Sequence, residues 1–291
     1  MKHLRFPVML FVFFVAYHCQ PAYAKGVTVQ TNVQYGTASN VPLLMDIYEP
    51  AAHTASPCIV LIHGGGWVEG DKAQYISMGK GLAADGFVAV SIDYRMLPKF
   101  PYPAALDDSQ LAVRFLRANA GKYGINPSEI GALGDSAGGY LAALLGLRDT
   151  RDTTAALQNY SSKVEAVVDF YGPTDFTVPA KDISPLGVML VNNFLNSTQA
   201  KDPGLYKSSS PITYVSKGAP PFLVLQGTAD TLVPFSQSSE LYTALKAVGS
   251  DVTLLGVYGA QHAFLTSSPD PGIYLPLCAG FFSNAFHTNT N

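Results

Sequence analysis

The sequence has little charge and few cysteines, and it contains a single tryptophan. Of its 291 residues, 13% are charged and 48% are hydrophobic. A chain with so little charge and so many apolar residues is globular with a large core, which excludes a disordered protein. No cluster of lysine and arginine is present, which argues against nucleic acid or an anionic membrane as a partner.

Metal-ligand spacings are also missing. The cysteines are far apart and the histidines are isolated, so we predict no metal site and no cofactor. Beyond the N-terminal segment two cysteines remain, Cys58 and Cys278, each in an apolar stretch. The sequence leaves open whether they form a disulfide or stay two buried thiols, and it does not indicate the oligomeric state.

One apolar run, Phe6 to Tyr17, stands out, but it is short for a membrane span. Lys2 and Arg5 precede it, and Ala22-Tyr23-Ala24 follows it with the small-x-small pattern of a cleavage site. These features predict a signal peptide, residues 1–24, cleaved after Ala24, and hence a secreted or periplasmic protein without stable membrane insertion. Cleavage would change the net charge from −3 to −5 because it removes two basic residues. The alternative is an uncleaved N-terminal anchor.

Short runs rich in Val, Ile and Leu recur after this segment, with helical patterns between them. Strands buried on both faces of a parallel sheet have this composition, so the alternation predicts a layered α/β domain over residues 25–291. The first two runs are expected to form an antiparallel pair. The predicted strands are Val27–Tyr35, Leu43–Tyr48, Cys58–Ile62, Phe87–Ile92, Ile130–Leu133, Val164–Phe170, Pro221–Leu225 and Val252–Val257, and the predicted helices are Ala104–Tyr123, Ser136–Leu147, Ser236–Val248 and Ile273–Phe286.

The segment Gly172 to Val215 does not follow this alternation, because it is long and polar and is broken by five prolines. A long insertion in a compact domain is usually functional or mobile. We therefore predict that it forms a partial lid beside a functional site.

The stretch Gly134-Asp135-Ser136-Ala137-Gly138 lies between a predicted strand and an alanine- and leucine-rich helix. It matches G-x-S-x-G, in which glycines flank the serine because a tight strand-to-helix turn leaves no room for side chains. Such a turn lifts the hydroxyl above the sheet at a helix N-terminus. We predict that Ser136 is a nucleophile; the alternative is a serine that only caps the helix.

A nucleophilic serine needs a base to take its proton and a carboxylate to orient that base. His262 follows a late predicted strand, which would bring it to the same sheet edge as Ser136. Two aspartates satisfy the chain order Ser, Asp, His. We favour Asp230, which begins an ordinary strand-loop-helix connection next to the strand that delivers the histidine. Asp175 opens the insertion, where a turn is the simpler role.

A histidine and three glycines follow the predicted strand Cys58–Ile62. Acyl transfer through serine creates an oxyanion, which fixed backbone N–H groups stabilise, and a glycine loop can present them unshielded. The glycines lack the spacing of a phosphate-binding loop, which is the alternative. The predicted oxyanion donors are Gly65, Gly66 and Ala137; the predicted pocket residues are Trp67, Asp135 and Tyr171; His63 is expected to fix the loop.

Longer stretches complete this pattern. They are "LMDIYEP", "HGGGWVEGDK", "DYRMLPKFPYPAALDD", "GDSAGG", "YGPTDF", "SPITYVSKGAPPFLVLQGTADTLVP" and "GAQHAF". On these stretches, from about residue 33 to residue 264, the chain resembles the HGGG-bearing carboxylesterases of the α/β-hydrolase superfamily, which include relatives of hormone-sensitive lipase. Within that group it is most similar to the acetylxylan and feruloyl esterase-like branch. The resemblance implies a three-layer α/β-hydrolase fold with a mostly parallel eight-stranded sheet and a small lid-like insertion at 172–215.

The resemblance also implies a function. It is that of a secreted serine carboxylesterase that cleaves short acyl or phenolic acyl esters, small or polysaccharide-linked, through an acyl-enzyme. The alternatives are an amidase or formamidase of the same fold and a non-catalytic binding protein on a hydrolase scaffold. The sequence differs from the usual pattern of these esterases at two places near the expected triad. It has Gln261-His262-Ala263 where Gly-His-Gly or Gly-His-Ser is usual, and it has "QGTAD" where "HGTAD" is common. The apolar side chains of the insertion are expected to crowd the site and leave a short acyl pocket; they are Leu186, Val188, Met189, Leu190 and Phe194.

Overall fold

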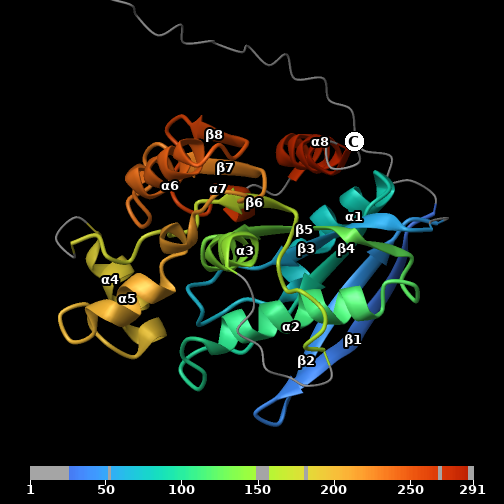
Figure 1. Ribbon diagram of the computed structural model, residues 1–291, viewed down its shortest axis with the longest axis horizontal. Coiled ribbons are helices and arrows are strands. Elements are labelled where there is room, and N and C mark those ends of the chain that lie inside the picture. The colour runs from blue at the N-terminus through green and yellow to red at the C-terminus, as the bar shows by residue number, and fades with distance from the viewer. Residues whose placement is uncertain (1–25, 52–53, 149–156, 180–182, 268–270, 288–291) are drawn as a thin grey trace, which may run out of the picture.

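The computed structural model describes residues 26–51, 54–148, 157–179, 183–267 and 271–287. The predicted signal peptide therefore lies outside the described residues. An eight-stranded sheet, in the order β1-β2-β4-β3-β5-β6-β7-β8, crosses the middle of the molecule between two layers of helices (Figure 1).

The strands match the predicted pattern in number and direction. The pairs β1–β2 and β2–β4 are antiparallel, and every other neighbouring pair is parallel, which confirms a mostly parallel sheet. The strands are β1 Thr28–Ala38, β2 Val41–Glu49, β3 Ser56–Ile62, β4 Val88–Ile92, β5 Ile125–Asp135, β6 Ala166–Phe170, β7 Phe222–Gly227 and β8 Val252–Val257.

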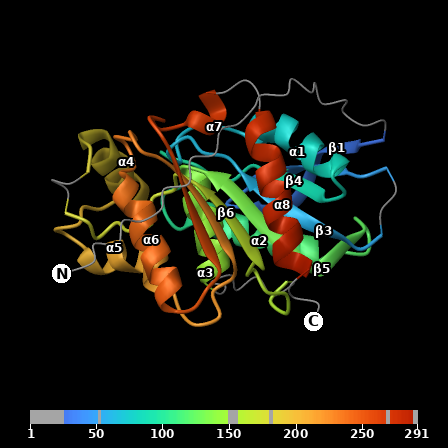
Figure 2. The ribbon, with the colours of Figure 1, turned by 90° about the horizontal axis from the view of Figure 1, so that it is seen from above.

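Helices cover both faces of the sheet and bury one apolar cluster on each face. Helices α1 (Ile76–Ala84) and α8 (Tyr274–His287) pack on one face, where Figure 2 shows them next to each other across the strands. Helices α2 (Ala104–Ala118), α3 (Ala137–Leu147) and α6 (Phe235–Ala247) pack on the other. All five residues from Cys58 to Ile62 in β3 are 0% exposed, so the central strands are buried from both sides.

Helix α1 was not among the predicted helices, because Gly79 and Gly81 interrupt its sequence pattern. Both glycines permit close packing. A Cβ on Gly79 would lie 2.5 Å from the ring of Tyr48, and one on Gly81 would lie 2.3 Å from the side chain of Leu275. Tertiary packing therefore outweighs the low helix propensity of glycine here.

The insertion is more ordered than the sequence suggests. It contains α4 (Pro185–Leu195), α5 (Pro203–Ser209) and the 3₁₀ turn η3 (Pro211–Tyr214), and both ribbon views place α4 and α5 at one end of the molecule beside α6 (Figures 1 and 2). Three of its five prolines, Pro185, Pro203 and Pro211, start these elements rather than break them. Ser184 caps α4 and Asp202 caps α5, each directly before a proline at the first helical position. Proline is tolerated there because its missing N–H would have no partner in the helix.

The two cysteines are free and buried. Cys58 belongs to the core on the α3 side of the sheet and Cys278 to the core on the α8 side. The two cysteines are therefore separate thiols and form no disulfide with each other. Burial raises the pKa of both thiols.

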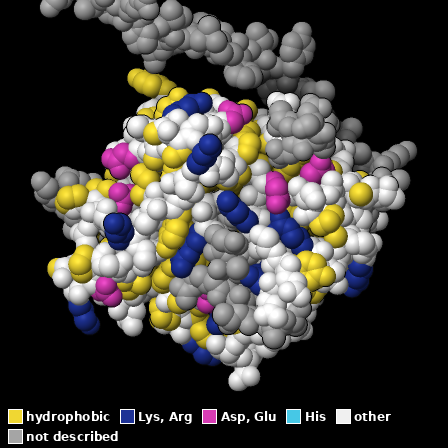
Figure 3. Space-filling model, viewed as in Figure 1, with side chains coloured by type: hydrophobic (Ala, Val, Ile, Leu, Met, Phe, Trp, Pro, Cys, Tyr) yellow, Lys and Arg dark blue, Asp and Glu magenta, His cyan; other side chains and the backbone are white. Residues whose placement is uncertain are grey.

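The described surface is mixed in character. On the face seen in Figure 3, acidic and basic side chains are interspersed rather than gathered into a large patch of one sign.

Shorter helical turns connect the remaining elements: η1 Lys72–Tyr75, α7 Phe264–Ser267 and η4 Pro271–Ile273. Within the described ranges no helix has the length and apolarity needed to cross a membrane.

Candidate active site

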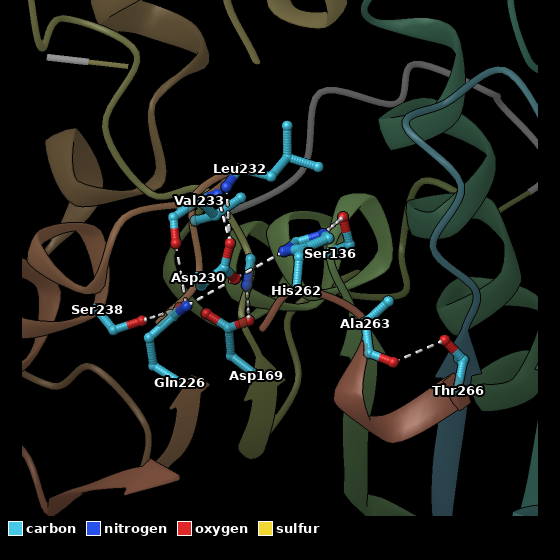
Figure 4. Close-up of polar contacts among 11 residues, drawn as sticks. Ser136, Asp169, Gln226, Asp230, Leu232, Val233, Ser238, His262, Ala263 and Thr266 are labelled. Carbon is cyan, nitrogen blue, oxygen red and sulfur yellow. Dashed lines mark hydrogen bonds and ion pairs between the residues drawn. The ribbon is translucent and has the colours of Figure 1, made fainter. Parts of the chain in front are cut away.

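Three side chains from three loops form a hydrogen-bonded chain at the carboxyl edge of the parallel strands. Ser136 Oγ lies 2.9 Å from His262 Nε2, and His262 Nδ1 lies 2.7 Å from Asp230 Oδ2 (Figure 4). An ionised carboxylate can only accept, so Nδ1 carries the proton and Nε2 is free to accept the serine proton. The sequence placed these residues after β5, β7 and β8, and the structure brings them together.

Ser136 occupies a strained turn between β5 and α3. Its φ of 51° and ψ of −116° are unusual for a residue with a side chain. A Cβ on Gly134 would lie 2.3 Å from Gly138, and a Cβ on Gly138 would lie 1.9 Å from the Ile62 carbonyl oxygen. Both flanking glycines are therefore required by the turn, and the Ser136 N–H donates to the Phe170 carbonyl at 2.8 Å.

Asp230, rather than Asp175, contacts the histidine. The N–H groups of Leu232 and Val233 both donate to Asp230 Oδ1 at 2.9 Å. Asp175 is half-buried, and its Oδ1 accepts from the N–H and hydroxyl of Thr177 at 2.7 and 2.6 Å. Asp175 thus closes a local turn in the insertion.

The glycine loop after β3 presents its backbone toward the serine. Gly65 and Gly66 have φ values of +100° and +59°, and a Cβ on Gly65 would lie 2.1 Å from the Glu69 carbonyl oxygen. Gly66 and Ala137 line the same pocket as Ser136, whereas Gly65 is outside its wall. Among the described residues we find no partner for the N–H groups of Gly65, Gly66 or Ala137.

His63 supports this loop. Its ring is buried and stacks on Tyr94 at 4.3 Å between centroids, and its Nδ1 donates to the Gly64 carbonyl at 2.8 Å. Burial lowers the pKa of His63, which favours the neutral ring. The geometry is that of a side chain that fixes the loop.

Asp135 and Tyr171 are not among the residues that line the pocket, contrary to the sequence-based expectation. Asp135 ends β5 and is buried, and its Oδ1 accepts from the Gly64 N–H at 3.0 Å and the Tyr75 hydroxyl at 2.8 Å. Tyr171 packs its ring against that of His262, with centroids 4.9 Å apart. Both residues support the site rather than line it.

The pocket beside Ser136 is small and mainly apolar, with a volume of ≈ 50 Å³, which is room for a few water-sized groups. Trp67 lines it together with Phe176, Leu190 and Val191. Trp67 also stacks on Phe194 of α4, with ring centroids 4.0 Å apart.

Of the five apolar insertion residues predicted to crowd this site, Leu190 lines the pocket and Phe194 anchors α4. The other three do not line it: Val188 is half-buried, and Leu186 and Met189 are 51% and 50% exposed to solvent. The helical period explains the split, since residues on one face of α4 turn inward. Over the described ranges we find no cluster of His, Cys, Asp and Glu suited to a metal ion.

Asp169 is a buried carboxyl group that the sequence analysis missed. It lies in β6 with 0% exposure, and its Oδ1 accepts from the Gly172 N–H at 2.8 Å. Oδ2 has no hydrogen-bond partner among the described residues. Burial raises the pKa of Asp169 to about 7, and the Gly172 hydrogen bond opposes that shift. The available signal was the acidic residue within the apolar run "AVVDF".

We expect the substitution Asp169→Asn to change how stability depends on pH. The unfolded wild type loses this proton near its ordinary pKa of 3.8, whereas the folded protein keeps it to about 7. Between these values the unfolded state binds fewer protons, so the free energy of unfolding of the wild type falls as pH rises. The variant has no such proton. Its stability relative to wild type should therefore increase by roughly 2–4 kcal/mol between pH 4 and pH 8.

Urea unfolding of both proteins across this pH range measures the difference. Asp251→Asn, at an exposed position, is the matched control and should show no comparable trend. A difference between Asp169→Asn and wild type that stays constant with pH would contradict the assignment of a raised pKa.

Comparison with known families and relatives adds to this geometry. The sequence model of the BD-FAE family matches residues 45–245. The esterase LipC of Mycobacterium tuberculosis is 34% identical over 218 residues, 72% of this chain and 53% of that protein. The esterase LipQ of the same organism is 32% identical over 241 residues, 80% of this chain and 57% of that protein. The chain thus spans about half the length of these curated relatives.

Solved structures agree with this comparison. Esterase 2 of Thermogutta terrifontis, with propionate bound, superposes with a TM-score of 0.76 at 27% identity, covering 91% of this chain and 96% of that one. A truncated carbohydrate esterase from gut microbiota gives a TM-score of 0.76 at 30% identity, covering 92% and 98% of the two chains. The Thermogutta esterase has also been solved in a form phosphorylated by paraoxon, with a TM-score of 0.73.

Proposed function

The chain belongs to the BD-FAE family of α/β-hydrolases, and on that basis we propose that it is a carboxylic ester hydrolase. The observation that carries the proposal is the hydrogen-bonded chain Ser136–His262–Asp230 beside a small apolar pocket. Esterases among its relatives and structural neighbours support the reaction class.

In the proposed reaction, Ser136 Oγ attacks the ester carbonyl carbon while His262 Nε2 takes the hydroxyl proton. Asp230 holds the ring in the tautomer that can accept this proton and stabilises the imidazolium that forms. The N–H groups of Gly65, Gly66 and Ala137 are the proposed donors to the oxyanion. His262 then returns the proton to the leaving alkoxide, and an acyl-serine remains. Water, deprotonated by His262, hydrolyses the acyl-enzyme and regenerates Ser136.

The direct test is hydrolysis of 4-nitrophenyl acetate by the purified protein. A neutral phosphate triester should also inactivate the protein with one-to-one stoichiometry by modifying Ser136. Absence of both activities in the folded protein would refute the proposal and favour a binding protein on a hydrolase scaffold.

We further propose that the substrates carry short acyl groups, because the pocket volume is only ≈ 50 Å³. Each methylene that fits an apolar pocket contributes about 0.8 kcal/mol of transfer free energy. Methylenes that do not fit contribute none of it and add steric strain. The value of kcat/KM should therefore peak between acetyl and butyryl esters and fall for octanoyl and longer esters.

A series of 4-nitrophenyl esters, measured below the micelle limit, decides this point. Leu190→Ala should move the maximum to longer chains, because Leu190 lines the pocket. Leu186→Ala, at an exposed position on the same helix, is the matched control and should leave the profile unchanged. A wild-type maximum at decanoyl or beyond would contradict the small-pocket proposal.

The natural substrate class and the location of the protein are finer proposals. We propose that short acyl groups on plant polysaccharide, such as acetyl groups, are among the substrates, whereas phenolic acyl groups are larger than the small pocket accommodates. Support comes from the resemblance of the sequence to acetylxylan and feruloyl esterase-like proteins and from the truncated carbohydrate esterase among the structural neighbours. Release of acetate, but not of ferulate, from acylated xylan is the expected result. The basic head, apolar run and cleavage pattern of residues 1–24 support export, and a mature N-terminus at Lys25 is the expected finding on N-terminal sequencing.

A further inference from the structure

Gln226 occupies a completely buried position next to the acid of the site. It lies in β7, with 0% exposure, four residues before Asp230. Its Nε2 donates to Asp230 Oδ2 at 2.9 Å and to the Val233 carbonyl at 3.0 Å, and its Oε1 accepts from the Ser238 hydroxyl at 2.9 Å (Figure 4). The two acceptors on one side and the hydroxyl donor on the other fix the orientation of the amide.

The hydrogen bonds to Asp230 are divided between its two oxygens. Oδ1 is held by the N–H groups of Leu232 and Val233, within its own loop. Among the described residues, Oδ2 accepts from two side chains, Gln226 and His262. In the proposed reaction His262 accepts and releases protons, whereas Gln226 does not. Gln226 is therefore the constant hydrogen-bond donor that holds Asp230 Oδ2 in place. Its second bond, to the Val233 carbonyl, ties the same loop to β7.

We propose that Gln226 is a positioning residue that acts through Asp230. Its amide N–H holds the carboxylate oxygen that orients His262, and Ser238 on α6 holds the amide in turn. The role in turnover rests on the proposed function, because it presumes that Ser136, His262 and Asp230 react as a unit. A purely structural amide would affect stability alone, whereas a positioning residue also affects kcat.

The first test is Gln226→Leu, which removes the donor at similar volume. A hydrogen bond to a charged group supports a loss in kcat on the order of 10- to 100-fold. KM should stay within about threefold, because Gln226 is not among the pocket residues. The matched control is Gln110→Leu, which also removes a fully buried amide but in α2. Gln226→Leu should lower both the melting temperature and kcat, whereas Gln110→Leu should leave kcat unchanged. A folded Gln226→Leu with kcat within twofold of wild type would overturn the proposal.

The second test, Gln226→Glu, keeps the shape of the side chain and replaces the amide NH₂ group by an oxygen that is either protonated or charged. A protonated glutamic acid can still donate to Asp230, whereas an ionised glutamate is an acceptor of the same charge sign. The ratio of variant to wild-type kcat should therefore fall as pH rises. Asp230 is the charged group that faces position 226, and the ratio at each pH refers the variant to wild type under the same conditions. A ratio near one at every pH would overturn the proposal, and this variant serves if the leucine variant does not fold.

A third measurement does not depend on turnover. The proton on His262 Nδ1, bonded to Asp230, can be followed by its low-field NMR signal in wild type and variants. Gln226→Leu should shift or broaden this signal, whereas Gln110→Leu should leave it unchanged. If the wild type hydrolyses no ester, the proposed function fails, but the NMR comparison still decides whether Gln226 positions Asp230. An unchanged signal in folded Gln226→Leu would overturn the positioning role.

Discussion

Replacement of Ser136 by alanine is expected to abolish ester hydrolysis while the protein stays folded. The hydroxyl of Ser136 lies 2.9 Å from His262 Nε2, and alanine has no group that could make this contact. Alanine fits the same backbone, because the turn is held by the flanking glycines and by the Ser136 N–H bond to the Phe170 carbonyl. Removal of a nucleophile of this kind costs on the order of 10⁴- to 10⁶-fold in kcat.

The measurement is kcat on 4-nitrophenyl acetate, with circular dichroism to confirm the fold. Mass spectrometry after treatment with a neutral phosphate triester gives a second readout, since the alanine variant has no hydroxyl to modify. Ser239→Ala, at a half-buried position in α6, controls for the loss of a serine hydroxyl elsewhere. Activity of a purified, folded Ser136→Ala within tenfold of wild type would remove Ser136 from the proposed mechanism.

The core of the site could be predicted from the sequence because each residue follows an apolar run that forms a strand. The apolar runs that became β5, β7 and β8 are strong local signals, and parallel strands bring their carboxyl ends to one edge. The order Ser136, Asp230, His262 then sufficed to place the three side chains together. The choice of Asp230 over Asp175 also followed from this logic, since Asp175 begins an irregular connection.

The arrangement of the insertion could not be predicted in the same way. The prolines of the insertion predict breaks in regular structure, but Pro185 and Pro203 stand at first helical positions behind a serine and an aspartate cap. The sequence signal was present in these caps. The inward turn of Leu190 and the outward turn of Leu186 depend on how α4 docks, and Trp67 fixes that docking by stacking on Phe194.

The buried polar residues that support the site were missed for a different reason. Asp169 and Gln226 sit inside apolar strands, where a local pattern gives no indication of a partner. Their partners are a backbone N–H beyond the strand end and a carboxylate on the next loop. Such contacts depend on the three-dimensional course of the loops. "QGTAD" was recognised as a departure from the related pattern, but its consequence for Asp230 required the structure.

Replacement of Asp230 by asparagine is expected to cost roughly 10⁴-fold in kcat, as in other triads in which the acid becomes an amide. Asp175→Asn should cost far less, because Asp175 contacts Thr177 rather than His262. An asparagine at position 175 keeps the acceptor oxygen that closes this turn, and because Asp175 also lines the pocket, the two variants are compared in kcat rather than in KM. The measurement is kcat on 4-nitrophenyl acetate for both variants, together with melting temperatures.

The size of the expected loss follows from the hydrogen bonds around Asp230. Its two oxygens accept four bonds, two on each oxygen. An amide in this place must turn its NH₂ group either toward the two backbone donors or toward Gln226 and His262. The second arrangement places fewer donors against each other, because His262 can change tautomer so that its Nδ1 accepts from the amide. Nε2 would then carry the proton and could no longer accept one from Ser136. If Asp175→Asn instead proved the more damaging variant, the acid role would pass to Asp175, and the proposed proton path from Ser136 to the carboxylate would be wrong.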